Sequence, residues 1–276
     1  MNTIQINSNL FINNNIECVL NYYKQGKATI HKTILNKKIL VNNQPVQLSY
    51  VIKENDEITF LDEEIKIIPY KRNIEILFEN DYIIVVNKPA NILVHPDGNT
   101  NETLQNAVAY YLIKNKKPVF CQAVHRLDYE TTGIIIFAKN NLALSFLSYA
   151  FENKMIKKEY ACLINGKMNP LNGIIDKPIG KDRHSNKQVV CKTGKPAKTI
   201  YETIWFKAGI SKLKIQIIGG RKHQIRIHFQ SAGHPIIGDK IYANDNDEQL
   251  KLHACKLMFL DPQTYKEITI ESKENF

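Results

Sequence analysis

The chain has 276 residues, of which 43% are apolar and 23% charged, so it can bury a sizeable core and has an ordinary soluble, globular composition. Its 37 lysines and arginines exceed its 27 aspartates and glutamates, and the net charge of +10 favours a polyanionic partner, above all nucleic acid. Five scattered cysteines without a Cys-x-x-Cys pair, no signal-peptide pattern and no apolar run near ~20 residues argue against a disulfide framework, a zinc ribbon and a membrane span, and favour the cytoplasm.

Residues 1–70 are expected to form a small α+β unit with basic residues near its second helix. Apolar residues at helical spacing predict a helix over 16–23, and a second short helix is predicted over 29–36. Two segments of strand and turn follow, at 38–45 and at 51–60. The polar segment at 70–73 then marks a domain boundary, so that residues 71–276 form the second domain.

The second domain opens with two predicted strands, over 74–78 and 81–89, and Pro89 ends the second of them. The chain then turns back at Asn91, where a tight turn needs a positive φ that asparagine tolerates. Helical periodicity over 103–114 predicts a helix with Thr103 or Asn101 as its N-cap.

Residues 123–139 combine a polar cluster with a dense apolar run. The run from Gly133 to Lys139 is typical of a buried strand, and Asn140 can cap a helix after it. Asp128 lies just before this strand, where a charged group is costly unless it is paired. The residues alone leave two interpretations open, a structural aspartate in a turn or a functional carboxylate.

Two later segments carry many basic residues. Residues 177–200 are rich in lysine and in turns, and they form either a solvated hairpin face or, as the total charge favours, a surface that contacts phosphates. Residues 221–233 follow two glycines and end at Gly233, so we prefer a helix to a strand there.

Several common kinds of site are not indicated by the sequence. His223 and His228 are not spaced i, i+4 as two metal ligands on one helix face would be, so no metal is expected. The glycine motifs that bind nucleotides and the serine elbow of hydrolases are also missing from the sequence. Asp128 then stands out as a carboxylate that could act as a nucleophile or as a general base.

The motifs of the second domain together resemble those of the RNA pseudouridine synthases, in the branch that modifies large-subunit ribosomal RNA and some tRNAs. The run His125-Arg126-Leu127-Asp128, with Thr131, Thr132 and Gly133 after it, resembles the catalytic motif of that family. Three further motifs occur in the family's order, around Lys88, around Tyr160 and over 220–239. Tyr129, Glu130 and Lys222 stand where other residues are usual. The first unit resembles an S4-type RNA-binding module, a common partner of this family.

The resemblance implies a role for each matching residue. Asp128 would be the essential carboxylate, which attacks ribose C1′ or removes a ribose proton while the uracil detaches. Arg226 would hold Asp128 in a charge-assisted pair, and Tyr160 would stack on the uracil. The residues expected to contact the RNA or to shape its pocket are Arg126, Lys88, Arg221, His223 and Gln224. No cofactor is expected, because the reaction is an isomerisation.

The resemblance also implies an α+β fold, with a mixed, mainly antiparallel central sheet, flanking helices, a cleft and the small S4-like domain in front. The expected function is isomerisation of specific flipped-out uridines in 23S ribosomal RNA, or else in tRNA. A non-catalytic RNA-binding or ribosome-assembly protein is the alternative, and a glycosylase that releases uracil is a third possibility. RNA is the expected partner, without a membrane or an obligate protein partner. In such an enzyme Asp128, Tyr160 and Arg226 must meet in one basic cleft.

Overall fold

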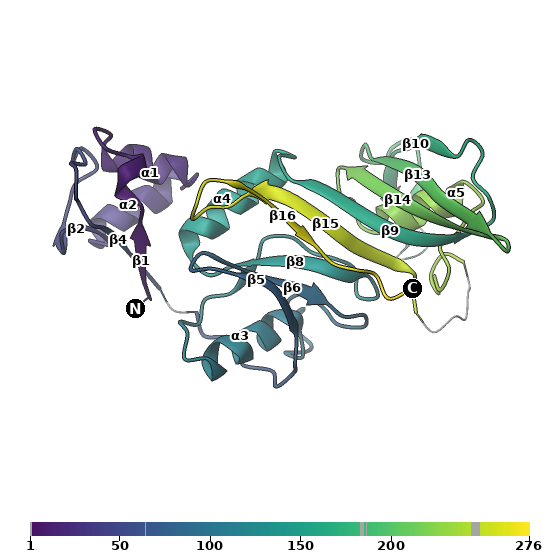
Figure 1. Cartoon of the computed structure of the whole chain (residues 1–276), viewed down its shortest axis with the longest axis horizontal. Coiled ribbons are helices and arrows are strands. Elements are labelled where there is room, and N and C mark those ends of the chain that lie inside the picture. Colours follow the sequence, from purple (N-terminus) through teal and green to yellow (C-terminus); the bar gives the residue numbers. More distant parts are fainter. Residues whose placement is uncertain (1, 64, 183–184, 186, 244–248) are drawn as a thin grey trace.

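The computed structural model describes residues 2–63, 65–182, 185, 187–243 and 249–276. These residues form a four-stranded sheet near the N-terminus, a ten-stranded sheet that fills most of the molecule and a two-stranded hairpin. Figure 1 shows the N-terminal unit at one end and the large sheet beside it. In the described part of the chain, no helix is long and apolar enough to cross a membrane.

The N-terminal unit contains the two predicted helices, α1 (Ile16–Tyr22) and α2 (Lys27–Leu35). The side chain of Asn15 caps α1 by accepting a hydrogen bond from the N–H of Cys18 at 2.9 Å. The sheet has the order β1-β4-β2-β3, and its strands are β1 (Asn2–Ile6), β2 (Ile39–Val41), β3 (Gln44–Pro45) and β4 (Ile58–Asp62). Strand β1 was not predicted, because it depends on antiparallel pairing with β4, which is distant in sequence.

The N-terminal unit shares a hydrophobic core with the rest of the chain. Tyr23 is fully buried, and its hydroxyl lies 3.4 Å from that of Tyr82 beyond the joining segment. Asp62 accepts a hydrogen bond from the N–H of Asn141, the first residue of α4 (Asn141–Glu152), at 2.6 Å. The described residues that join the two sheets, 65–74, hold no helix or strand, and the predicted boundary at residue 70 lies among them.

The large sheet is mixed and mainly antiparallel, as predicted, with β8 and β15 as its parallel pair. Its order is β10-β13-β14-β9-β15-β8-β6-β5, with β16 added to β15 and β7 to β8. The strands are β5 (Glu75–Glu79), β6 (Ile83–Lys88), β7 (Gln122–Ala123), β8 (Thr132–Ala138), β9 (Lys157–Asn165), β10 (Asn172–Asp176), β13 (Lys198–Lys207), β14 (Ile210–Ile218), β15 (Leu252–Leu260) and β16 (Glu267–Glu271). Strand β13 was not predicted, because it depends on antiparallel pairing with β10 and β14.

Helices cover both faces of the sheet where β6 and β8 lie. Neighbouring residues of a strand point to opposite faces, so alternate residues of β6 contact different helices. Ile83 and Val85 pack in the cluster that contains residues of α4 (Asn141–Glu152), whereas Ile84 and Val86 pack with α3 (Leu104–Lys114). Burial on both faces explains the continuous apolar runs from which these strands were predicted.

Helix caps and residues with positive φ set the backbone conformation around the predicted motifs. Thr103 and Asn140 cap α3 and α4 by accepting hydrogen bonds from main-chain N–H groups, as predicted. Asn91 has the expected positive φ, at 59°. Gly133 has a φ of 117°, and a Cβ there would lie 2.3 Å from the carbonyl oxygen of Ala254 in β15. Glycine at this position therefore lets β8 begin directly after the Asp128 loop.

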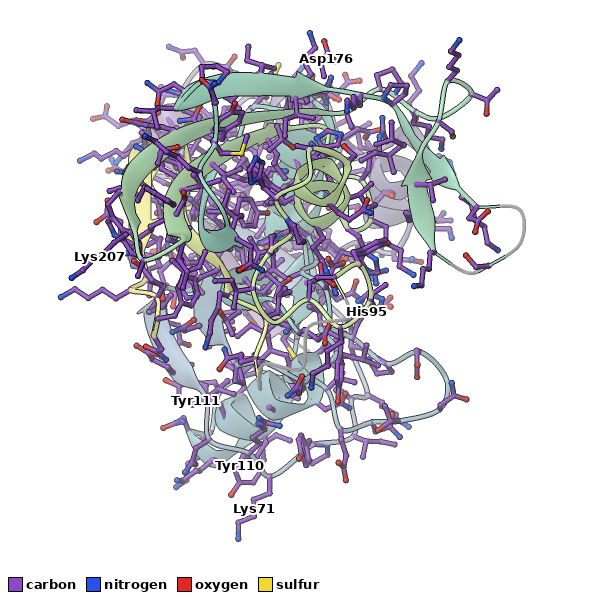
Figure 2. All side chains as sticks on the ribbon, turned by 90° about the vertical axis from the view of Figure 1, so that its right-hand side faces the viewer. Lys71, His95, Tyr110, Tyr111, Asp176 and Lys207 are labelled. Carbon is purple, nitrogen blue, oxygen red and sulfur yellow. The ribbon has the colours of Figure 1, made fainter. Side chains whose placement is uncertain are left out.

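The preferred helix in the last motif is confirmed as α5 (Gln224–Ser231), preceded by Gly219 and Gly220 at positive φ. The lysine-rich segment before β13 forms the hairpin of β11 (Ile179–Lys181) and β12 (Gln188–Val190). Figure 2 shows this hairpin projecting from the body of the protein. The described lysines of the whole segment 177–200 are exposed: Lys177, Lys181, Lys187, Lys192, Lys195 and Lys198. Arg183 of the same segment lies outside the described residues.

Candidate active site

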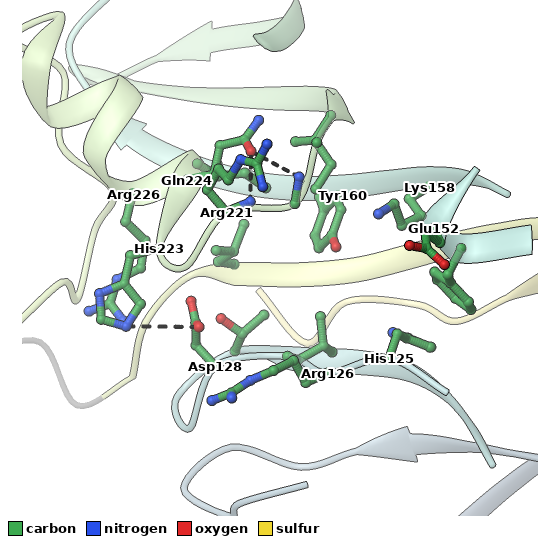
Figure 3. Close-up of a pocket in the computed structure, with 18 residues that line it drawn as sticks. His125, Arg126, Asp128, Glu152, Lys158, Tyr160, Arg221, His223, Gln224 and Arg226 are labelled. Atoms are coloured by element: carbon green, nitrogen blue, oxygen red, sulfur yellow. Dashed lines mark hydrogen bonds and ion pairs between the residues drawn. The ribbon is translucent and has the colours of Figure 1, made fainter. Parts of the chain in front are cut away.

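The motifs of the second domain surround one pocket of about 340 Å³. The loop before β8 supplies Asp128, strand β9 supplies Tyr160, and helix α5 supplies Arg226. Figure 3 shows these residues on different walls of the pocket, with Tyr160 projecting from β9. The fold therefore brings together the three residues that the sequence singled out, although nearly a hundred residues separate the first from the last.

Lys88 fixes the main chain of the loop that carries Asp128. The side chain is fully buried, and its Nζ donates to the carbonyl oxygens of Pro89 at 3.1 Å, Tyr129 at 2.9 Å and Thr131 at 2.7 Å. Burial lowers the pKa of Lys88 to about 7, although the charge of Asp128 opposes this shift. Lys88 was predicted to contact RNA or shape the pocket, and the structure corrects this to shaping alone, because its ammonium is enclosed by carbonyl groups.

Arg226 holds the loop in place from the opposite wall. It is 1% exposed, and its Nε and Nη2 donate to the two carboxylate oxygens of Asp239 at 2.9 and 2.7 Å. The same Nη2 donates to Glu130 at 2.9 Å, two residues after Asp128. Burial alone would lower the pKa of Arg226, but its hydrogen bonds to Asp239 hold the pKa above the ordinary value.

The expected direct pair between Arg226 and Asp128 is wrong for this structure. Within the described residues, the ion pairs of Arg226 are those with Asp239 and Glu130. The guanidinium already donates hydrogen bonds to two carboxylates, and its bidentate pair with Asp239 is stronger than a pair through a single hydrogen bond. Arg226 therefore positions the Asp128 loop through Glu130.

His223 is the ion-pair partner of Asp128 within the described residues. Its Nε2 lies 3.8 Å from Oδ1 of Asp128, and its Nδ1 lies 2.8 Å from the hydroxyl of Tyr242. Its φ of 56° is unusual for a residue other than glycine, and its side chain lines the pocket. Burial lowers the pKa of His223, whereas the charge of Asp128 opposes this effect.

The other predicted RNA contacts divide into two kinds. Arg126 and Arg221 line the pocket with exposed side chains that can reach a bound strand. Gln224 is 3% exposed; its Oε1 accepts from the N–H groups of Gly220 and Arg221, both at 3.0 Å, and its Nε2 donates to the carbonyl of Lys198 at 2.9 Å. The prediction of an RNA contact is thus corrected for Gln224, because the main chain occupies its amide.

Tyr160 presents a neutral ring to the pocket. It is 8% exposed, and burial, with the charge of Asp128 adding to it, raises the pKa of its hydroxyl above the ordinary value. No hydrogen bond joins that hydroxyl to another residue in the described part of the chain. The ring is therefore available to stack on a flat group bound between it and Asp128.

Four site residues received no role from the sequence. Glu130 and Asp239 share the guanidinium of Arg226, Tyr242 supports His223, and Lys158 lines the pocket beside Tyr160. Lys158 could have been found from the alternation of β9, because it precedes Tyr160 by two residues and faces the same side. The other three depend on contacts distant in sequence.

The histidines of the last motif contact other groups of the protein. His228 is buried, with its ring nitrogens 2.8 Å from the hydroxyl of Thr199 and 2.9 Å from the carbonyl of Lys177. Within the described ranges, no group of three side chains of the kinds that bind metals is found.

The chain matches known proteins over the same motifs. The family model for RNA pseudouridylate synthase matches residues 82–231. RNA pseudouridine synthase YhcT of Bacillus subtilis is 35% identical over 260 residues, which cover 90% of this chain and 85% of that protein. Ribosomal large subunit pseudouridine synthase D of Neisseria meningitidis is 31% identical over 271 residues, covering 91% and 72%.

A solved structure shares the fold. Human RNA pseudouridylate synthase domain containing 1 superposes with a TM-score of 0.64 at 24% identity, over 74% of this chain and 84% of that one. The fold, the matched residues and the curated relatives agree with the resemblance found in the motifs. The chain therefore belongs to the RNA pseudouridine synthase family, whose members are isomerases that convert uridine in RNA to pseudouridine.

Proposed function

We propose that this protein isomerises specific uridines of large-subunit ribosomal RNA, with Asp128 as the reacting carboxylate. The observation that carries the proposal is the pocket in which Asp128 faces Tyr160 with Arg126 and Arg221 at its rim. Glu152 also lines this pocket, but it is exposed at the end of α4, whereas Asp128 is partly buried. Asp128 is thus the carboxylate placed to meet a ribose inside the pocket.

The target uridine must leave its stack to reach Asp128. Extruding a base costs roughly a few kcal/mol and is cheaper in loops and single strands. Phosphate contacts from exposed cations, such as Arg126, Arg221 and the lysines of the β11–β12 hairpin, offset that cost. The uracil then stacks on Tyr160, and its ribose C1′ lies at Asp128.

Two chemical routes are compatible with this placement. Asp128 either attacks C1′ or removes a ribose proton, and in both routes the bond from C1′ to N1 breaks and the uracil rejoins through C5. His223 and Arg226 act as positioning residues, His223 by facing the carboxylate and Arg226 by holding Glu130 in the same loop. Tyr160 stacks on the base and assists loss of the C5 proton.

Ribosomal RNA is the favoured substrate for two reasons. Several relatives carry the name ribosomal large subunit pseudouridine synthase D. The N-terminal unit, with two helices and a small sheet, has the elements of an S4-like RNA-binding domain, and the exposed face of α2 carries Lys27, His31 and Lys32. We assign residues 1–70 to that domain and residues 71–276 to the catalytic domain.

The experiment uses RNA from cells that lack the gene. Purified protein is incubated separately with ribosomal RNA and with tRNA labelled at C5 of uridine, and tritium release and the modified positions are measured. Release from large-subunit RNA is expected at positions that wild-type cells modify. Release from tRNA alone would move the substrate to tRNA, free uracil would indicate a glycosylase, and binding without any base change would indicate a non-catalytic RNA-binding protein.

A further inference from the structure

Lys158 places a positive charge inside the pocket that the chain itself does not neutralise. It precedes Tyr160 by two residues on β9, so both side chains face the same side of the strand, and both line the pocket. Within the part of the chain that the structure describes, no ion pair joins Lys158 to a carboxylate. Burial lowers the pKa of Lys158 below its ordinary value.

The surroundings of Lys158 are aromatic. Its Nζ lies 5.7 Å from the centre of the Phe151 ring, and that ring stacks on His125 with 4.5 Å between ring centres. Nε2 of His125 accepts the N–H of Ile136 at 3.1 Å, and burial lowers the pKa of His125 to about 3, so the imidazole is neutral. Among the described residues, no oxygen atom accepts a hydrogen bond from the Lys158 ammonium, and the Glu152 carboxylate that lies beside it in Figure 3 forms no ion pair with it.

Lys158 and Asp128 lie toward opposite ends of the pocket, with Tyr160 between them (Figure 3). If Asp128 meets the ribose, the uracil extends from C1′ across the Tyr160 ring toward Lys158. The edge of uracil that lies farthest from the ribose carries the carbonyl oxygen at C4, which accepts hydrogen bonds. A lysine at that end therefore meets an acceptor and not the sugar.

We infer that Lys158 is a further catalytic residue, which donates a hydrogen bond to a carbonyl oxygen of the extruded uracil and stabilises the negative charge that the base acquires. The inference rests on the proposed function, because it needs the uracil in this pocket. When the bond from C1′ to N1 breaks, its electron pair leaves with the uracil and spreads onto the carbonyl oxygens. A fixed cation at that position stabilises this state more than the intact uridine.

The electrons and atoms balance without a further reactant. The base turns, and its C5=C6 π pair forms the bond from C1′ to C5 while the pair left on N1 forms N1=C6. C5 then loses its proton, which restores C5=C6, and N1 gains a proton. The bond of Asp128 to C1′ forms and breaks again, or the ribose proton that it removes is returned. Lys158 remains protonated throughout and acts by charge and hydrogen bonding alone.

The test compares Lys158→Met with Lys157→Met in single-turnover reactions. Lys157 is the adjacent residue of β9, exposed and outside the pocket, so it controls for the loss of one positive charge. We expect Lys158→Met to lower the rate by about 100-fold, as for loss of one electrostatic donor at a reacting centre, with RNA affinity changed by less than about threefold. Lys157→Met should stay within about twofold of the wild-type rate.

A substrate containing 5-fluorouridine separates this role from a structural one. Fluorine withdraws electrons and makes the uracil a better leaving group, so the charge needs less support. The ratio of the wild-type rate to the Lys158→Met rate should therefore be smaller when the enzyme consumes 5-fluorouridine in the RNA than when it consumes uridine. Lys158→Arg, which keeps the charge, should recover at least part of the rate and serves as the second variant if Lys158→Met does not fold.

Three results would count against the inference. Equal rates for the two methionine variants would overturn it, and so would equal rate losses with both substrates. A loss of RNA affinity with a weaker salt dependence and an unchanged single-turnover rate would show that Lys158 binds a phosphate instead. A wild-type protein that modifies no RNA would remove the proposed function, an outcome distinct from an active wild type with an equally active Lys158→Met.

Discussion

The two ends of the pocket treat buried charge in different ways. At the α5 end, Arg226 donates three hydrogen bonds to Asp239 and Glu130, and its charge is neutralised within the protein. At the β9 end, Lys158 faces an aromatic ring and has no carboxylate partner among the described residues. A charge that the protein itself neutralises holds the site together, whereas a charge without a partner in the protein is available to a substrate. The charge of Asp128 is also available to a substrate, because its partner His223 lies as far as 3.8 Å away.

The largest loss of stability is expected when the ion pairs of Arg226 at the α5 end are removed. Arg226→Met leaves Asp239 buried without its cation, and removing one partner of a buried ion pair costs about 3–5 kcal/mol. Arg221→Met, an exposed arginine of the same segment, should change the free energy of unfolding by less than about 0.5 kcal/mol. Urea unfolding of both variants measures the difference, and equal stabilities would show that the network around Arg226 is not structural.

The stability of the protein should fall in acid because of His125, which lies at the β9 end of the pocket. Its pKa is about 3 in the folded protein and near 6.5 when unfolded, so the unfolded state binds more protons between these values and stability falls as the pH falls. Relative to His125→Gln, which retains an acceptor for Ile136 without the ionisation, the wild type should lose about 2 kcal/mol between pH 6.5 and pH 5.

The exposed His31 supplies the control for this pH effect. Wild type and His31→Gln should lose stability in parallel on acidification, as followed by thermal or urea unfolding at each pH. If His125→Gln also follows the wild type through this range, His125 is not held neutral beside Lys158.

A smaller effect on stability and rate is expected from loss of the hydrogen bond between Tyr242 and His223, which lies on the Asp128 side of the pocket. Tyr242→Phe removes the hydroxyl that contacts Nδ1 of His223 and accepts the N–H of Gln188 at 3.2 Å. Loss of such hydrogen bonds costs about 1 kcal/mol, and the single-turnover rate should fall several-fold because His223 loses its support. Tyr201→Phe, whose hydroxyl bonds to the carbonyl of Pro170, is the matched control, and it should leave the rate unchanged. Equal rates for both variants would remove Tyr242 from the positioning of His223.

Much of the fold could be predicted because its signals are local. Capping residues and periodicity located α1, α3 and α4, and burial on both faces gave β6 and β8 their apolar runs. Strands β1 and β13 escaped prediction because each depends on partners elsewhere in the chain: β1 pairs with β4, and β13 lies between β10 and β14.

In the site, too, the features that depend on contacts distant in sequence could not be predicted. The motifs identified Asp128, Tyr160 and Arg226, and the fold places them around one pocket. The sequence could not show that Glu130 and Asp239 compete for Arg226, because that depends on side-chain geometry across three segments. The hydrogen bonds of Lys88 and Gln224 could not be predicted for a related reason: the polar groups that enclose these side chains are main-chain atoms, whose positions a residue pattern does not show.

The most direct measurement of the central claim is tritium release in a single turnover by Asp128→Asn and by Glu152→Gln. These residues are the carboxylates that line the pocket, and both substitutions remove one negative charge with little change of shape. Asp128→Asn should lower the rate by at least about 1,000-fold with its unfolding curve preserved, because loss of a reacting group has effects of this size. Glu152→Gln should retain the rate within a few-fold. A folded Asp128→Asn protein that releases tritium at the wild-type rate would contradict the assignment of Asp128 as the reacting carboxylate.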